Sequence, residues 1–152
     1  MPESTLKQNA PAPDFTLKDE EGKTVRLSAF KGKQAVILFF YPGDFTPGCT
    51  LQLCSVRDDW KKFEETHAAV FGINHGKNAS HKSFREKYHF PFPLLIDTDK
   101  KISHLYGAER MILKTRVIKR TVVGIDKEGI VRYFKHGMPR NQEILKAMKS
   151  FI

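Results

Sequence analysis

Residues 34–58, QAVILFFYPGDFTPGCTLQLCSVRD, join the most apolar run of the chain to the segment that holds both of its cysteines. Residues 34–41 are apolar on both faces, which is typical of a central strand that is covered on both sides. Thr46 suits the N-cap of a helix, and Pro47 suits its first position. The stretch therefore predicts a buried strand that leads into a helix with Cys49 in its first turn.

Strand and helix patterns alternate along the rest of the chain. The expected elements of the first half are a hairpin over residues 14–28 with its turn at Glu21 and Gly22, the strand 34–41, a helix over 47–67, a strand over 69–75, and a helix that starts at the capping residue Asn78 or Ser80 and ends before Pro91. The second half is expected to form a strand over 92–97, a short helix over 100–106 closed by Gly107, two strands over 116–126 and 130–136, and a helix over 140–152. Crossovers mixed with hairpins predict an α/β domain of three layers around a mixed central sheet. A thioredoxin-like fold fits this order best, although other α/β arrangements are compatible with the pattern.

No linker, repeat or low-complexity tract divides residues 1–152, so we expect a single domain. In the long helix over 47–67, the apolar stripe of Leu51, Val56, Trp60 and Phe63 is expected to face the core. This stripe would place the helix against the apolar strand that precedes it.

The chain is basic, with 26 Lys and Arg against 17 Asp and Glu and a formal net charge of +9. Because the basic residues are scattered and no aromatic-rich binding motif accompanies them, we do not expect a nucleic-acid partner. The longest apolar run, residues 35–40, is too short to cross a bilayer, and residues 1–13 lack the apolar region of a signal peptide. Two cysteines are too few for a secreted disulfide scaffold. These features predict a cytoplasmic protein with no membrane partner.

The two cysteines stand five positions apart in the expected helix. A thiolate at Cys49 would be stabilised by the N–H groups at the helix N-terminus. In a regular helix the two Cα atoms lie about 8.6 Å apart, which is farther than the roughly 7 Å that a disulfide allows. A disulfide therefore requires local unwinding, and this spacing suits a reactive Cys49 with a resolving Cys54. On spacing alone, two buried cysteines with a purely structural role are the alternative.

The spacing of the histidines and cysteines disfavours two further kinds of site. The six histidines show no zinc-type spacing with each other or with the cysteines, so we expect no metal site. The cysteine spacing also differs from C-x-x-C, which argues against a direct dithiol exchanger of the thioredoxin type. Cysteine chemistry without a metal is the prediction that remains.

The motif P-x-x-x-T-x-x-C, formed by Pro42, Thr46 and Cys49 at the end of a buried strand, resembles the active-site motif of the peroxiredoxins. The longer string FYPGDFTPGCTLQLCSVRD is similar to the bacterioferritin-comigratory-protein branch, also called the Q-type peroxiredoxins. APDFTL, HKSFREKYHFPFPLLID and RTVVGIDKEGIV extend the resemblance over nearly the whole chain.

The resemblance implies roles for particular residues. Cys49 would be the peroxidatic nucleophile, and Cys54 would be the resolving thiol. Thr46 would orient the peroxide, and Pro42 would shield the thiolate from solvent. An arginine on a later strand would stabilise the thiolate and the polarised O–O bond, and Arg120 occupies that place, with Arg116 as its rival.

The implied activity is a thiol-dependent peroxidase that reduces hydrogen peroxide and organic hydroperoxides. A thioredoxin or a similar dithiol would reduce the Cys49–Cys54 disulfide, with no cofactor, and we expect a monomer. The alternative of another class is a redox-sensing regulatory protein that the same disulfide switches. A noncatalytic α/β binding module is disfavoured because it would leave the cysteine motif without a purpose.

The chain departs from the family pattern at three places. Gly124 lies inside an expected strand, where it would weaken the strand or mark a bulge. Residues 107–119 form a shorter segment than is usual in this branch. Gly43 and Phe45 replace residues that are usually polar, which bears on the polarity of the pocket mouth.

Overall fold

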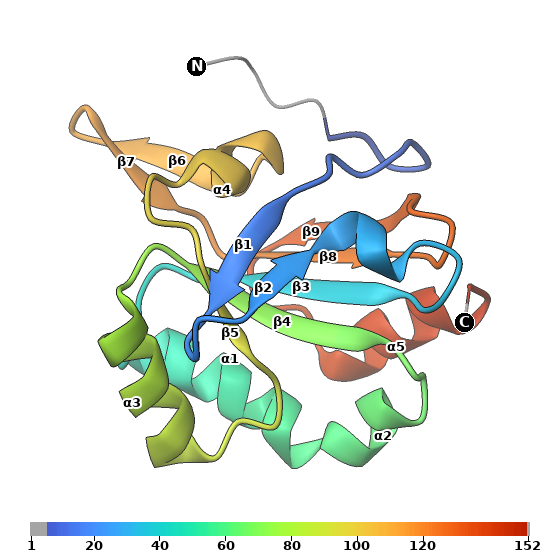
Figure 1. Ribbon diagram of the computed structural model, residues 1–152, viewed down its shortest axis with the longest axis horizontal. Coiled ribbons are helices and arrows are strands. Elements are labelled where there is room, and N and C mark those ends of the chain that lie inside the picture. The colour runs from blue at the N-terminus through green and yellow to red at the C-terminus, as the bar shows by residue number, and fades with distance from the viewer. Residues whose placement is uncertain (1–5, 152) are drawn as a thin grey trace.

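The structure, a computed structural model, describes residues 6–151 and is built on a seven-stranded sheet (Figure 1). The strands are β1 (Thr16–Asp19), β2 (Thr24–Arg26), β3 (Val36–Phe40), β4 (Ala69–Asn74), β5 (Leu94–Ile96), β6 (Glu109–Ile112), β7 (Thr115–Ile118), β8 (Thr121–Ile125) and β9 (Val131–His136). The helices are α1 (Pro47–Asp58), α2 (Trp60–Glu64), α3 (Asn78–Tyr88), α4 (Lys101–Leu105) and α5 (Asn141–Lys149), with a 3-10 turn, η1, over Leu27–Phe30.

The sheet is mixed, in the order β2-β1-β5-β4-β3-β8-β9. At its centre β3 pairs with β4 in parallel and with β8 antiparallel. All five residues of β3 are buried, as its two-sided apolar pattern predicts. This arrangement confirms the predicted thioredoxin-like α/β fold with a mixed sheet.

Alternate residues of β3 face two separate cores. Ile37 and Phe39 pack on the side of α1, α2, α3 and α5, which lie together on one face of the sheet (Figure 1). Val36, Leu38 and Phe40 pack on the other side, which η1, α4 and the β6–β7 hairpin cover. The sheet is thus the middle of three layers, and α1 lies directly against its central strand.

The predicted helix over residues 47–67 is in fact two helices. Asp59 leaves the helical conformation, with φ −97° and ψ 17°, and separates α1 from α2. The break lets Trp60 contact the ring of Phe92 and lets Phe63 contact the ring of Phe39. These aromatic contacts to β3 and to the segment before β5 explain why two short helices replace a long one.

The apolar stripe predicted for this helix is also wrong at its first member. Leu51 is 66% exposed, whereas the buried residues of α1 are Cys49, Gln52, Leu53 and Val56. These four follow the i, i+3, i+4, i+7 pattern of one helical face. Cys49 therefore belongs to the face of α1 that packs on the sheet.

The strand predicted over residues 116–126 is divided between two sheets. Its first part is β7, which pairs with β6 in a separate two-stranded hairpin that the sequence did not predict. Leu113 and Lys114 form the hairpin turn with φ of 47° and 67°. Because neither is the glycine or asparagine that such turns favour, no turn signal marks this hairpin in the sequence. Lys119 and Arg120 form the corner between β7 and β8.

Gly124 marks an irregularity, as predicted. The register of β8 with β9 shifts between Gly124 and Ile125. A Cβ atom on Gly124 would lie 2.4 Å from the sulfur of Met148 in α5 and 3.1 Å from Cβ of Tyr133. The glycine therefore allows α5 to approach β8 closely.

The start of α3 differs from the predicted cap. The helix begins at Asn78, but its N-cap is Lys77, and no side-chain capping bond is formed. Ser80, the other predicted cap, donates its hydroxyl to Asp44 instead. Within residues 6–151, no helix combines the length and apolar character needed to span a bilayer.

Candidate active site

Cys49 lies in the first turn of α1, the helix that follows the central strand β3 along the chain. Thr46 is the N-cap residue, Pro47 is the first helical residue, and the N–H of Thr50 donates to the carbonyl oxygen of Thr46 at 2.9 Å. Cys49 and Cys54 are both free thiols in an intact helix. The predicted placement of the motif at a strand-to-helix junction is therefore confirmed.

Arg120 faces the sulfur of Cys49. Its Nη1 atom lies 3.5 Å from Sγ of Cys49 and donates to Oε1 of Gln52 at 3.1 Å. The Cys49 side chain is fully buried, so a permanent positive charge lies beside a sulfur that is shielded from water. Such a charge favours the thiolate and any negative charge that develops on an attacked oxygen.

The rival arginine lies elsewhere. Nη1 of Arg116 is 3.8 Å from a carboxylate oxygen of Glu109 and 3.4 Å from Nδ1 of His104. Those partners belong to β6 and α4, on the other face of the sheet from α1. Of the two candidates, Arg120 is the one that the fold brings to Cys49.

Two residues that shape this contact were missed in the sequence. A Cβ atom on Gly48 would lie 2.8 Å from Nη2 of Arg120, so the absence of a side chain there admits the guanidinium. Gln52 is buried three positions after Cys49 and holds the guanidinium from the same helical face. Two sequence features could have indicated these residues: a glycine inside a helix and a polar residue on the apolar face of that helix.

The other two motif residues lie in the loop before α1. The hydroxyl of Thr46 donates to the carbonyl oxygen of Gly43 at 2.8 Å, which leaves its oxygen lone pairs able to accept from a peroxide O–H. Pro42 and Thr46 are both exposed, whereas Cys49 is buried. This placement is compatible with the shielding and orienting roles that the resemblance implies.

Cys54 has different surroundings from Cys49. It is half-buried and packs against the core on the α1 side of the sheet. Burial raises the pKa of the Cys54 thiol, the charge of Arg57 lowers it, and the charge of Asp58 raises it, with a net rise above the ordinary value. Cys54 is therefore a less acidic thiol than a free cysteine.

An open hollow of about 220 Å³ lies against α1 on the side of Gln52. Its lining includes Gln52, the partner of Arg120, together with the exposed side chains of Leu51 and Met138. Phe45, in the loop before α1, is another large apolar side chain that is exposed. The surface next to the site is therefore more apolar than the basic composition of the chain would suggest.

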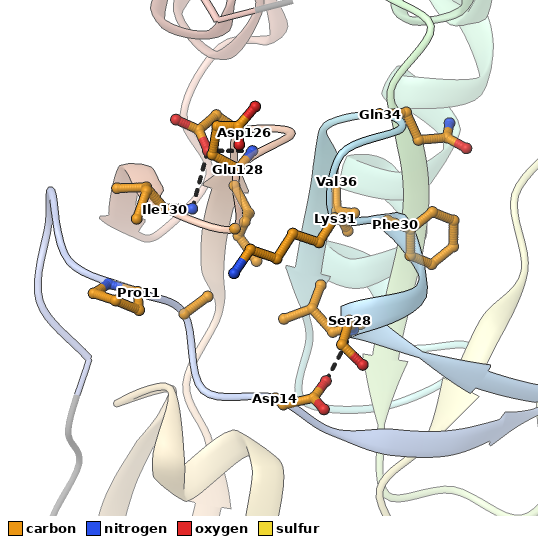
Figure 2. Close-up of a pocket in the computed structure, with 14 residues that line it drawn as sticks. Pro11, Asp14, Ser28, Phe30, Lys31, Gln34, Val36, Asp126, Glu128 and Ile130 are labelled. Carbon is orange, nitrogen blue, oxygen red and sulfur yellow. Dashed lines mark hydrogen bonds between the residues drawn. The ribbon is translucent and has the colours of Figure 1, made fainter.

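A second hollow, of about 210 Å³, lies where β3 begins and β8 ends (Figure 2). Val36 and Ile125 are among the residues that line it. Two carboxylates of its lining are hydrogen-bonded: Asp14 accepts from the N–H of Ser28, and Asp126 accepts from the N–H groups of Glu128 and Ile130. Over the described residues, no three His, Cys, Asp or Glu side chains are grouped to hold a metal ion.

Comparisons with known proteins show the family to which the chain belongs. Residues 9–134 match the model of the AhpC/TSA family. Peroxiredoxin Q of wheat, a chloroplastic protein, is 48% identical over 121 residues, which are 80% of this chain and 55% of the wheat protein. Peroxiredoxin Q of Sedum lineare, also chloroplastic, is 43% identical over 142 residues, which are 91% of this chain and 75% of that protein.

A solved structure extends the similarity to the fold. Peroxidoxin BcpB from Mycobacterium tuberculosis superposes with a TM-score of 0.87 at 30% identity, over 97% of this chain and 99% of that one. The chain spans little more than half the length of some plant relatives, such as the wheat protein. It belongs to the AhpC/TSA family, on the peroxiredoxin Q and bacterioferritin-comigratory-protein branch.

Proposed function

We propose that the chain is a thiol peroxidase that reduces hydrogen peroxide and organic hydroperoxides. The Cys49 thiolate attacks one peroxide oxygen, the O–O bond breaks, and the departing oxygen takes up a proton to leave as water or an alcohol. Cys49 becomes a sulfenic acid. The observation that carries this proposal is the 3.5 Å contact between the guanidinium of Arg120 and the buried sulfur.

The second step of the proposal is an intramolecular disulfide. The sulfur of Cys54 attacks the sulfenic sulfur of Cys49, and the hydroxyl group leaves as water after protonation. An external dithiol of the thioredoxin type then reduces the disulfide and is itself oxidised. The free thiols five positions apart in α1 support this assignment, because one helix supplies both sulfurs.

The test is the consumption of hydrogen peroxide coupled to a thioredoxin system. We expect continuous turnover by the parent protein and none by Cys49→Ser. A single equivalent of oxidation without turnover would instead favour a redox-sensing regulatory protein. Turnover that survives in Cys49→Ser would remove the proposed nucleophile.

We further propose a monomer in the cytoplasm. The low cysteine count supports a reducing compartment, and a resolving cysteine in the same chain removes the need for a second subunit. Light scattering after size-exclusion chromatography and fractionation of cells check the two points separately.

A further inference from the structure

The loop between β3 and α1, residues 41–46, is fastened to α3 through Asp44. The carboxylate of Asp44 accepts hydrogen bonds from the hydroxyl of Tyr41 at 2.7 Å, from the hydroxyl of Ser80 at 2.6 Å and from Nδ1 of His81 at 2.7 Å. The side chain of His81 is fully buried, and that of Asp44 is 4% exposed. Ser80 and His81 belong to α3, so a buried polar contact ties this loop to a helix other than α1.

His81 is held at both of its ring nitrogens. Nε2 lies 3.1 Å from the carbonyl oxygen of Leu95 in β5, while Nδ1 faces the carboxylate of Asp44. Both partners are hydrogen-bond acceptors, so a proton on either ring nitrogen has an acceptor within reach. Burial alone would raise the pKa of Asp44, but the hydrogen bond and charge of His81, with the bonds from Ser80 and Tyr41, hold that pKa below its ordinary value.

The next residue of the loop is also held by α3. Phe45 has φ of 62°, a left-handed conformation that costs a residue with a side chain about 1 kcal/mol or more. Its ring centroid lies 5.0 Å from that of Phe84 and 6.4 Å from that of Tyr88, both in α3. Because strained backbone persists only where its surroundings fix it, the contacts to α3 account for this conformation.

The start of the loop is fixed to the sheet by a third contact. The side-chain amide of Asn74, at the end of β4, donates to the carbonyl oxygen of Tyr41 at 2.7 Å. The N–H of Gly76 donates back to the amide oxygen of Asn74 at 2.8 Å. A Cβ atom on Gly76 would lie 3.2 Å from Oδ2 of Asp44, so the chain packs closely around the carboxylate.

We propose that Asp44 is a positioning residue that holds the loop carrying Pro42 and Thr46 beside the sulfur of Cys49. The inference rests on the proposed function, in which Thr46 orients the peroxide. Because the anchor belongs to α3, it does not depend on α1. The loop therefore keeps its place when α1 unwinds to form the disulfide, and the helix re-forms against it after reduction.

The test compares Asp44→Ala with Asp44→Asn in a Cys54→Ser background, where the sulfenic acid of Cys49 accumulates. Rapid mixing with hydrogen peroxide, followed by quenching and mass analysis, gives the rate of Cys49 oxidation. Asp44→Ala should slow this step by about 10- to 100-fold, since small misplacements of orienting groups have effects of that size. Asp44→Asn should stay within about threefold of the parent, because its amide can donate to a neutral His81 and its oxygen can accept from Tyr41.

Asp97→Ala is the matched control. Asp97 is also buried and also accepts three hydrogen bonds, from the N–H groups of Ile102 and Ser103 and from the hydroxyl of Ser103, but these belong to α4. It should lower thermal stability without slowing Cys49 oxidation. Should Asp44→Ala fail to fold, Ser80→Ala removes one of the three bonds and should give a smaller decrease of the same kind.

Three results would overturn the inference: oxidation in Asp44→Ala as fast as in the parent, equal slowing in Asp44→Asn and Asp44→Ala, or equal slowing in Asp97→Ala. Unchanged oxidation in Asp44→Ala would show that Asp44 does not position the loop. Equal slowing in Asp44→Asn would show that the charge of Asp44, and not its hydrogen bonds, affects the rate. Equal slowing in Asp97→Ala would show that the rate follows the stability of the fold. The proposed function fails separately, if the parent itself is oxidised no faster than a free cysteine.

Discussion

The side-chain nitrogen of Asn141, at the start of α5, lies 3.1 Å from the carbonyl oxygen and 3.0 Å from the hydroxyl of Ser55, the residue that follows Cys54. The same nitrogen lies 2.9 Å from the carboxylate of Asp59. Nη1 of Arg57 donates to the carbonyl oxygen of Tyr88 in α3 at 2.7 Å. The part of α1 after Cys54 is therefore tied to two other helices. The part before Cys54 starts at the exposed N-terminal end of the helix.

Formation of the disulfide should therefore unwind α1 over residues 47–54 and stop at Ser55. Hydrogen exchange of the oxidised protein should be faster over that segment, while residues 55–58 keep their protection. Asn141→Ala should let the faster exchange spread to residues 55–58. If the disulfide is confirmed by mass while residues 47–54 exchange equally in both redox states, unwinding is not needed and the helical geometry has been misjudged.

Arg120→Met should slow the oxidation of Cys49 by about 100-fold or more, because one preorganised charge at the reacting atoms is lost. Arg116→Met is the control, since Arg116 contacts Glu109 instead. It should leave the rate unchanged. The rates come from rapid mixing with hydrogen peroxide, and the reverse order of the two variants would transfer the role to Arg116.

Gly48→Ala should separate stability from activity. Alanine favours a helix more than glycine does, by up to about 1 kcal/mol. The new methyl group would meet only the flexible end of Arg120, at 2.8 Å from Nη2, and would push the guanidinium away from the sulfur. We expect a melting temperature that is equal or higher together with slower oxidation of Cys49. Unchanged oxidation would mean that the guanidinium can reach the sulfur by another path.

Gly124→Ala should destabilise the fold by about 1–3 kcal/mol, the usual effect of overpacking. The added Cβ would lie 2.4 Å from the sulfur of Met148 and 3.1 Å from Cβ of Tyr133. Denaturant unfolding measures the loss. In the double variant with Met148→Ala, the two losses should be less than additive, because the shorter side chain makes room for the methyl group. Strict additivity would show that Met148 is not the residue being displaced.

Cys54 should ionise above the ordinary thiol range of about 8.5 in the reduced protein. Burial raises the pKa of its thiol, so the thiolate fraction at neutral pH is lower than in a free cysteine. In Cys49→Ser, the rate of alkylation by iodoacetamide should therefore rise with pH and reach its midpoint above that of a model peptide. A midpoint at or below the peptide value would mean that the charge of Arg57 outweighs the burial.

The motif and its setting could be predicted from the sequence because their signals are local. An apolar run, a capping threonine and a proline within a few positions specify the passage from β3 to α1. The same reasoning placed Leu51 on the buried face, because it assumed a helix continuous to residue 67. The break at Asp59 is set by contacts of Trp60 and Phe63 with aromatic rings that are distant in the sequence. No local sequence pattern predicts these contacts.

The surroundings of the motif could not be predicted for a related reason. Asp44 and His81 are 37 positions apart, and Gln52 and Arg120 are 68 apart. Each pair meets only because the fold brings the loop after β3 to α3 and the corner before β8 to α1. A lone aspartate in a turn or a lone glutamine in a helix has an ordinary solvent-exposed explanation, so neither stands out before the fold is known.

The placement of both cysteines in α1 has a kinetic consequence. When both sulfurs belong to one chain, closure of the disulfide is a first-order event, and its rate does not depend on how much protein is present. A catalyst of this kind keeps its resolving rate on dilution, even at concentrations where paired subunits would separate. In the proposed cycle, the competition between closure and over-oxidation of Cys49 therefore depends on the peroxide concentration and not on the protein concentration.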